Sequence, residues 1–185
     1  PVAQLSASSG LTSHPVSTEV VLSANGQRLV VGAHGPAGAA SEVRVFDRQQ
    51  GRWNQTATLQ SAGAAWGFGE RLSLSADGQR LAVSAMYEPL RTSPTSPGVQ
   101  APAAPEAGAV YVFDQRAGQW TQTQRLNAAH GRSGDLFGSA LALSGDGRWL
   151  ASGARLEDGG ASGINAPSTS APAANSGAVY VYAPV

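Results

Sequence analysis

The sequence predicts an all-β chain made of four-stranded antiparallel units that stack as a partial β-propeller. Three observations lead to this fold class. First, FGERLSLSADGQRLAVSA begins at Phe68 and FGSALALSGDGRWLASGA begins at Phe137, 69 residues later. Second, each copy alternates apolar and polar residues and then turns at an Asn-Gly or Asp-Gly pair, which is typical of hairpins. Third, no stretch keeps the 3.6-residue period of an amphipathic helix.

The first two strands of each unit form a hairpin. The strands before the turn end in VVLS, LSLS and LALS, and those after it read RLVVGA, RLAVSA and WLASGA. The turns contain Asn25-Gly26, Asp77-Gly78 and Asp146-Gly147. Because such pairs tolerate positive φ at both positions, we expect tight type I′ turns there.

The third strand of each unit reads VRVF, VYVF or VYVY, and a glycine turn leads to a fourth strand, WNQTATL or WTQTQRL. β-Branched and aromatic residues favour half-buried strands. We expect Trp53 and Trp120, which open the fourth strands, to pack between units. Such short units cannot bury both faces alone, so they must stack, as propeller blades do. A β-trefoil also uses three repeats, but units near 65 residues fit it poorly.

We expect residues 1–185 to form a single propeller segment. Residues 1–52 hold the first blade with a leading outer strand, residues 53–119 the second repeat and residues 120–185 the third. Residues 2–7, VAQLSA, align with the fourth strands TATLQSA and TQRLNAA, so the chain opens on an outer strand and ends on a third strand. Three blades do not close a ring. The expected partner is therefore another propeller segment, in a homo-oligomer or in the rest of a longer chain.

These landmarks resemble a known family. The Phe68-Gly69 and Phe137-Gly138 pairs, the alternating run that ends in Asp-Gly, and the strand GAVYVF are similar to the FG-GAP repeat of integrin α-chain propellers and their bacterial relatives. The first copy departs from the pattern, with Val16-Ser17 in place of Phe-Gly. The resemblance implies a binding or scaffolding module at an extracellular, cell-surface or periplasmic location, with any signal sequence removed.

The resemblance also raises the question of calcium, because many FG-GAP blades carry an Asp-rich loop between their first two strands. Here each turn offers one such side chain, Asn25, Asp77 or Asp146. Calcium takes six to eight oxygen ligands. We therefore expect no metal site and no cofactor.

Composition excludes several classes of function. Twelve basic residues balance twelve acidic ones without a basic stripe, which argues against nucleic acid and anionic membranes as partners. The absence of Cys excludes thiolate metal sites and a Cys nucleophile. No apolar run approaches the roughly 18 residues of a membrane-spanning helix. Every basic residue is Arg, and Ala and Gly are abundant, as a GC-rich bacterial genome would produce.

Two connections between second and third strands are long, at residues 89–107 and 158–176. Both lie on one propeller face, together with the connections between units, and we expect this face to bind a protein or glycan ligand. Solvated padding is the alternative, because lengthening a loop costs little. The candidate ligand-binding residues are Tyr87, Glu88, His130, Glu157 and Asp158. Trp66 and Tyr87 are aromatic residues without a counterpart in the third repeat, and Glu88 and Glu157 are equivalent in the repeat.

No nucleophile elbow and no phosphate-binding glycine loop appears, so we expect no catalytic residue. The predicted function is a non-enzymatic binding or scaffolding module for protein or glycan recognition, adhesion or surface assembly. One alternative is a structural subunit that self-assembles to complete a ring or filament. Another is a lectin-like or hydrolytic site that uses the loop carboxylates.

Overall fold

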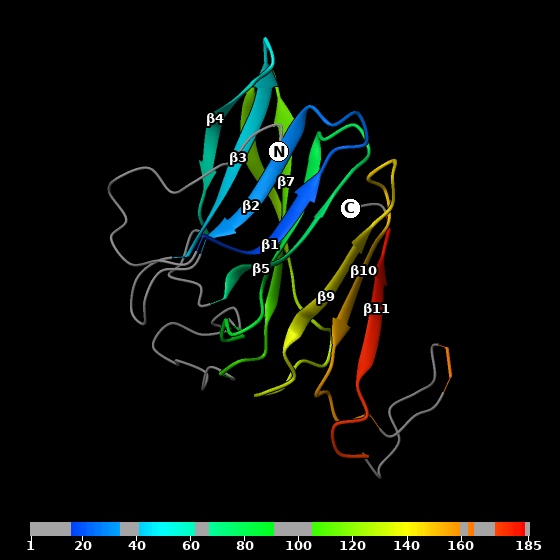
Figure 1. Cartoon of the computed structure of the whole chain (residues 1–185). Helices are drawn as coiled ribbons and strands as arrows, with labels where there is room; N and C mark the ends of the chain where they lie inside the picture. The colour runs from blue at the N-terminus through cyan, green and yellow to red at the C-terminus, as the bar shows by residue number, and fades with distance from the viewer. Residues whose placement is uncertain are drawn as a thin grey trace, which may run out of the picture.

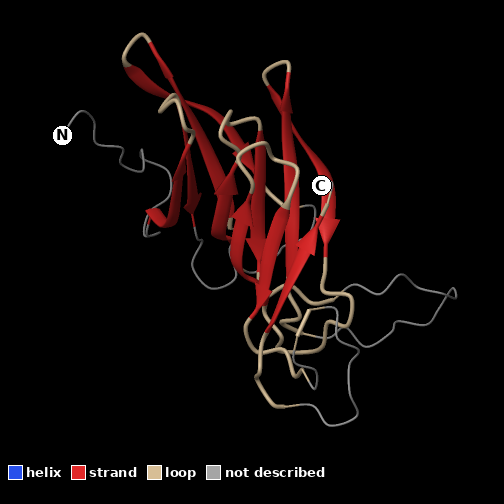
Figure 2. Ribbon diagram, turned by 90° about the vertical axis from the view of Figure 1, so that its right-hand side faces the viewer, coloured by secondary structure: helices blue, strands red, loops and turns tan. Residues whose placement is uncertain are grey.

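The computed structural model describes residues 16–33, 41–61, 67–90, 105–159, 163–164 and 173–183. Within these ranges all regular secondary structure is β, and eleven strands form three antiparallel sheets (Figures 1 and 2). The all-β class predicted from the alternating pattern is confirmed.

The first two sheets are four-stranded meanders, and the third has three strands among the described residues. The first sheet contains β1 (Val16–Leu22), β2 (Arg28–Ala33), β3 (Glu42–Gln49) and β4 (Arg52–Leu59). The second contains β5 (Phe68–Leu74), β6 (Arg80–Ala85), β7 (Ala109–Arg116) and β8 (Gln119–Leu126). The third contains β9 (Phe137–Leu143), β10 (Leu150–Ala154) and β11 (Ala178–Tyr182).

The sheets are offset from the predicted repeat boundaries. The sheets span residues 16–59, 68–126 and 137–182, whereas the repeats were divided at residues 53 and 120. Each of the first two sheets therefore takes its outer strand, β4 or β8, from the start of the next sequence repeat. Residues 2–7, the predicted leading outer strand, lie outside the described residues.

The three sheets share one register at their inner edge. Each innermost strand begins opposite an alanine that ends the second strand: Val16 with Ala33, Phe68 with Ala85 and Phe137 with Ala154. A bulge follows the first pair in every sheet. The first repeat thus keeps the backbone pattern although it lacks Phe-Gly.

The sheets fan out from their inner strands. β1 contacts β5 and β5 contacts β9, whereas the outer strands β4 and β8 touch each other far less (Figure 1). Twisted sheets that meet at their inner strands and diverge outward form the blades of a propeller. The fold is therefore an open, partial β-propeller.

The phenylalanine of each Phe-Gly pair anchors one sheet's core. Phe68 and Phe137 are fully buried. The ring centroid of Phe68 lies 5.7 Å from that of Tyr111, edge to face, and Phe137 meets Tyr180 in the same way at 5.6 Å. The apolar third strand and the Phe-Gly strand therefore pack as one unit in each sheet.

The glycine of the pair lets neighbouring sheets approach closely. Gly69 has φ +89°, and a Cβ there would lie 2.9 Å from Cγ2 of Val43 in the first sheet. Gly138 has φ +92°, and its Cβ would lie 3.1 Å from Cβ of Ser84 in the second sheet. Only glycine combines this backbone conformation with this spacing.

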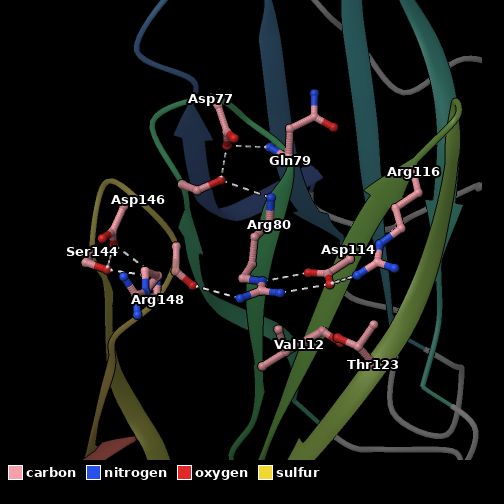
Figure 3. A network of polar contacts seen from close by, with 12 residues as sticks. Asp77, Gln79, Arg80, Val112, Asp114, Arg116, Thr123, Ser144, Asp146 and Arg148 are labelled. Carbon is pink, nitrogen blue, oxygen red and sulfur yellow. Dashed lines mark hydrogen bonds and ion pairs between the residues drawn. The ribbon is translucent and has the colours of Figure 1, made fainter. Parts of the chain in front are cut away.

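A half-buried arginine joins the second sheet to the third (Figure 3). Arg80 Nε donates to Asp114 Oδ1 at 2.6 Å and Nη2 donates to Oδ2 at 2.8 Å, while Nη1 donates to the carbonyl of Gly147 at 3.0 Å. The bond from Arg80 lowers the pKa of Asp114, and the bond to Asp114 raises the pKa of Arg80. One guanidinium thus fixes a strand pair and the β9–β10 turn together.

The first sheet has the equivalent arginine contact to its neighbouring sheet, and the third sheet has no arginine at this position. Arg28 binds Asp47 and donates to the carbonyl of Gly78 at 2.7 Å in the second sheet. Arg28 also lies over the ring of Trp120, 5.3 Å from its centroid, so Trp120 packs between two sheets as predicted. In the third sheet Trp149 stands where the arginine would be, and it is 55% exposed.

The turns differ from the predicted type. Asn25 and Asp77 do not have positive φ, so the turns between first and second strands are not type I′. Instead the Ser75 hydroxyl donates to Asp77 Oδ1 at 2.6 Å, and this bond lowers the pKa of Asp77. Positive φ at two successive residues occurs between third and fourth strands, at Gln50-Gly51 and Ala117-Gly118.

Candidate functional site

Two equivalent glutamates follow β6 and β10, at the end of the sheets where the second strands lead to the third strands, which we call the loop end. Glu88 N donates to the Ala85 carbonyl at 3.0 Å, and the Glu88 carbonyl accepts from Gly108 N at 2.9 Å. The same two backbone bonds hold Glu157, at 3.3 and 2.9 Å. The fold therefore places both carboxylates beside the start of a third strand.

In the second sheet Glu88 belongs to a closed cluster with Tyr111 and Arg125. The carboxylate is 2% exposed. Tyr111 Oη donates to Glu88 Oε2 at 2.7 Å, and Arg125 donates to Oε1 from Nη2 at 2.9 Å and from Nε at 3.2 Å. Arg125 also lies over the Tyr111 ring, 5.9 Å from its centroid. We call these three residues the Glu–Tyr–Arg cluster.

The electrostatics of the cluster keep Tyr111 protonated and Arg125 charged. Burial, with the bond to Glu88, raises the pKa of the Tyr111 hydroxyl, so it stays a donor. Burial by itself would lower the pKa of Arg125, but its bonds to Tyr111 and Glu88 raise it. Glu88 is therefore a buried, paired carboxylate rather than an exposed ligand contact, which corrects its predicted place on an open binding face.

In the third sheet the equivalent pair is Glu157 and Tyr180. Tyr180 Oη donates to both carboxylate oxygens, at 2.7 Å to Oε1 and 2.9 Å to Oε2. Burial, with this bond, raises the pKa of Tyr180. Within the described part of the chain no basic side chain contacts Glu157, and no strand equivalent to β8 pairs with β11. We call these two residues the Glu–Tyr pair.

Two further groups add to the negative charge around this pair. Asp135 is 3% exposed, and burial raises its pKa against the opposing hydrogen bond and charge of Arg132, with a smaller contribution from Asp158. The Asp135 carbonyl accepts from Leu156 N at 3.3 Å, which places it beside the loop that carries Glu157. The Glu–Tyr pair therefore lies in a more acidic environment than the Glu–Tyr–Arg cluster.

The other predicted site residues are spread over the loop end. Tyr87 is half-buried and packs on Gly67, where an added Cβ would lie 2.7 Å from its ring. His130 is exposed between β8 and β9. Asp158 is exposed and accepts from Asn175 N at 2.8 Å, so its carboxylate helps to close its own loop. Apart from the sequence neighbours Tyr87-Glu88 and Glu157-Asp158, no hydrogen bond or ion pair within the described part of the chain joins these five residues to one another.

The two long connections are ordered at their bases. Residues 105–107 pair with the segment before β9, where Phe137 N donates to the Ala107 carbonyl at 2.9 Å. Gly159 and Ala173 form an antiparallel bridge in the other connection. The long connections at residues 89–107 and 158–176 therefore have regular backbone pairing at these ends. Residues 91–104, 160–162 and 165–172 lie outside the described residues, as does Trp66.

Four site residues were missed: Tyr111, Arg125, Tyr180 and Asp135. A signal for Tyr180 was present in the sequence, because Tyr111 and Tyr180 are separated by the same 69 residues as Glu88 and Glu157. Two equivalent pairs of a donor and an acceptor point to contact within each repeat. Nothing in the local sequence marks Asp135, because its burial depends on how the loops pack.

Residues 120–182 match the family model of the FG-GAP repeat. The chain contains an FG-GAP repeat. The match begins in β8 and ends with the last residue of β11, so it contains the Glu–Tyr pair and the inner Phe-Gly of the third sheet. The resemblance drawn from the Phe-Gly pairs is confirmed in this repeat.

Two solved structures are similar to the chain. Hydrazine synthase of Kuenenia stuttgartiensis matches 75% of this chain and 42% of its own, at 11% identity and a TM-score of 0.46. TolB from Acinetobacter baumannii matches 92% of this chain and 44% of its own, at 13% identity and a TM-score of 0.34. The chain spans less than half the length of either protein. No curated protein matches it in sequence.

A membrane-spanning helix is not found among the described residues of this chain. Likewise, three or more metal-ligating side chains do not gather anywhere in the described ranges.

Proposed function

We propose that the chain is a non-enzymatic binding and scaffolding module of an extracellular, cell-surface or periplasmic protein, and that it acts by stacking on another propeller segment. The observation that carries this proposal is the open face of the third sheet, the side of β11 that bears Val179 and Val181. These side chains are 73% and 65% exposed. Their equivalents Val110 and Val112 in β7 are fully buried against the third sheet.

The opposite end of the fan offers a matching surface. Val20 and Leu22 of β1 are 52% and 55% exposed, at positions where β5 buries or half-buries Leu72 and Leu74. Burial of one such side chain stabilises a contact by on the order of 1.5–3 kcal/mol. If the β1 face of one segment stacked on the β11 face of another, the contact would repeat the packing between neighbouring sheets within the chain. Such a contact is head to tail, and it builds rings or filaments.

The state of the glutamates supports a role without catalysis. Glu88 is buried in an ion pair, and both oxygens of Glu157 accept from Tyr180. The FG-GAP repeat supports the extracellular or periplasmic setting, as the family resemblance implies. His130 and Asp158 are exposed at the loop end, so a protein or glycan ligand could reach both side chains.

Light scattering after size-exclusion chromatography of the full chain tests the stacking. We expect the mass to rise with concentration above the 18.8 kDa of one chain. Val181→Arg and Val20→Arg should each reduce this association by at least about tenfold, because each places a charge in an apolar contact. An equal mixture of the two variants should recover a dimer, since each keeps one intact face.

Gln122→Arg, at an exposed position of β8, serves as the control and should leave the mass unchanged. A wild-type chain that stays monomeric at every concentration would contradict stacking. Association that survives both arginine variants would place the contact elsewhere.

A further inference from the structure

The outer edge of β11 lies beside the Glu–Tyr pair of the third sheet. The equivalent residues of the second sheet form the Glu–Tyr–Arg cluster, which has an arginine in addition. In the second sheet, Arg125 of β8 completes the cluster with Glu88 and Tyr111. In the third sheet, the described residues supply only Glu157 and Tyr180. The strand that would carry the arginine is the one that this edge lacks among the described residues.

The ladder of the second sheet defines where that arginine would stand. Tyr111 pairs with Arg125 across the β7–β8 ladder, and Val110 pairs with Leu126. Tyr180 and Val179 occupy the equivalent places in β11. A strand added antiparallel to β11 in the same register would therefore set an arginine opposite Tyr180 and an apolar residue opposite Val179.

The charge around Glu157 favours a guanidinium over a neutral side chain. Tyrosine hydroxyls with raised pKa donate hydrogen bonds but bring no positive charge. Asp135 and Asp158 add two acidic groups near the pair. Arginine is also the cation best suited to the site, because its planar group can bind a carboxylate and lie over a tyrosine ring at the same time, as Arg125 does.

We propose that the edge of β11 binds an extended strand of the β8 kind, and that Glu157 and Tyr180 select a strand with arginine opposite Tyr180. The backbone of β11 supplies the ladder, and the Glu–Tyr pair supplies specificity. The partner is a strand that carries Arg-Leu, as β8 does at residues 125–126. The inference rests on the proposed function in one respect: it takes the third sheet to be a blade that another segment completes.

A peptide taken from the chain itself tests this selection. The probe is the capped peptide GQWTQTQRLNAA, residues 118–129, titrated into the full chain with binding followed by calorimetry. Its matched control replaces the arginine with glutamine. We expect the arginine peptide to bind at least about tenfold more tightly, because a charge-assisted pair replaces a neutral contact.

The chain variants locate the effect. In Glu157→Gln the preference for arginine should fall to about twofold or less, whereas Glu106→Gln, an exposed acid of the loop end, should keep it. Tyr180→Phe retains the ring and should reduce the preference only partly. A photo-crosslinker in place of the peptide's leucine should label residues 178–182 and not residues 109–116.

Equal binding of the two peptides, labelling away from β11, or no binding to the full chain would each overturn the proposal. Equal binding would mean that the edge does not distinguish arginine from glutamine. A neutral segment such as residues 2–7, which has Gln4 at the position of Arg125, would then fit the edge equally well. The stacking proposal is tested separately, because Val181→Arg should reduce self-association and leave the ratio between the two peptides unchanged.

Discussion

The second and third sheets share a strand pattern, a Phe-Gly anchor and a Glu–Tyr contact, yet they differ in what surrounds them. The second sheet is covered on both faces, and Val110 and Val112 are fully buried. The third sheet is covered on one face, and Val179 and Val181 are largely exposed. Near-identical strands therefore reach opposite states of burial because of position in the fan and not because of residue type.

The comparison also separates residues that form contacts between or within sheets from equivalent residues that lack these contacts among the described residues. Arg80 and Asp114 form a joint between sheets, whereas their equivalents Trp149 and Ala183 cannot. Glu88 has its arginine, whereas Glu157 does not have one among the described residues. The second sheet thus shows a four-stranded blade with its glutamate paired to an arginine, and the third shows the same Glu–Tyr contact without that pairing among the described residues.

The largest expected difference comes from placing a charge on the equivalent valines. Val112→Arg buries a guanidinium among apolar side chains and should destabilise the fold by at least about 3 kcal/mol. Val181→Arg, studied in dilute solution where the open face meets water, should change the free energy of unfolding by less than about 0.5 kcal/mol. Urea denaturation measures both. Similar losses would mean that the third sheet's open face is covered after all.

A smaller difference is expected from removing the equivalent tyrosine hydroxyls. Tyr111→Phe takes a donor from a buried carboxylate and should cost about 1–3 kcal/mol. Tyr180→Phe should cost less than about 1 kcal/mol, because Glu157 is only half-buried and water can replace the donor. Thermal unfolding followed by circular dichroism would rank the two variants. The reverse order would contradict the distinction between a closed cluster and an open pair.

The smallest expected effect concerns the joint between sheets and its dependence on pH. Because Arg80 lowers the folded-state pKa of Asp114 below the ordinary 3.8, the pair stabilises the fold above that value. This stabilisation is lost as pH falls through the lowered folded-state pKa. Asp114→Asn should cost about 1 kcal/mol at neutral pH and flatten the acid limb of a stability profile between pH 2 and 7.

Ala183→Asp is the matched control in the third sheet, where Trp149 replaces the arginine. It should leave both the neutral-pH stability and the acid limb unchanged within about 0.5 kcal/mol. An acid limb that is the same in wild type and Asp114→Asn would show that other carboxylates govern acid unfolding.

Much of the fold followed from local pattern. The alternation in LSLS and LALS, the β-branched third strands and the 69-residue offset predicted the strands and their order. The turn types were predicted less well. In Asp77-Gly78 a serine two residues earlier binds the aspartate, and this side-chain bond replaces the type I′ geometry that the pair suggests in isolation.

The candidate site was predicted only in part, because a repeat shows which residues are equivalent and not which are covered. Glu88 and Glu157 looked alike as loop-edge acids, and the structure buries one and leaves the other half-exposed. Arg125 lies 37 residues from Glu88 in the chain and meets it only when β8 pairs with β7. Such a contact depends on the register in which β7 pairs with β8, and this register cannot be read from the identity of the residues.

The sequence by itself determined the repeating unit, because the period of two in side-chain direction and the turn glycines act within a few residues. The tertiary structure decided which face of each unit is buried and, among the described residues, which strand edges are paired. That outcome depends on whether a neighbouring sheet excludes water from the face, and on whether a fourth strand pairs with the edge. In the third sheet, the exposure of the β11 valines and the contacts of the Glu–Tyr pair therefore depend on the neighbouring strands and sheets, and the repeat pattern alone does not predict them.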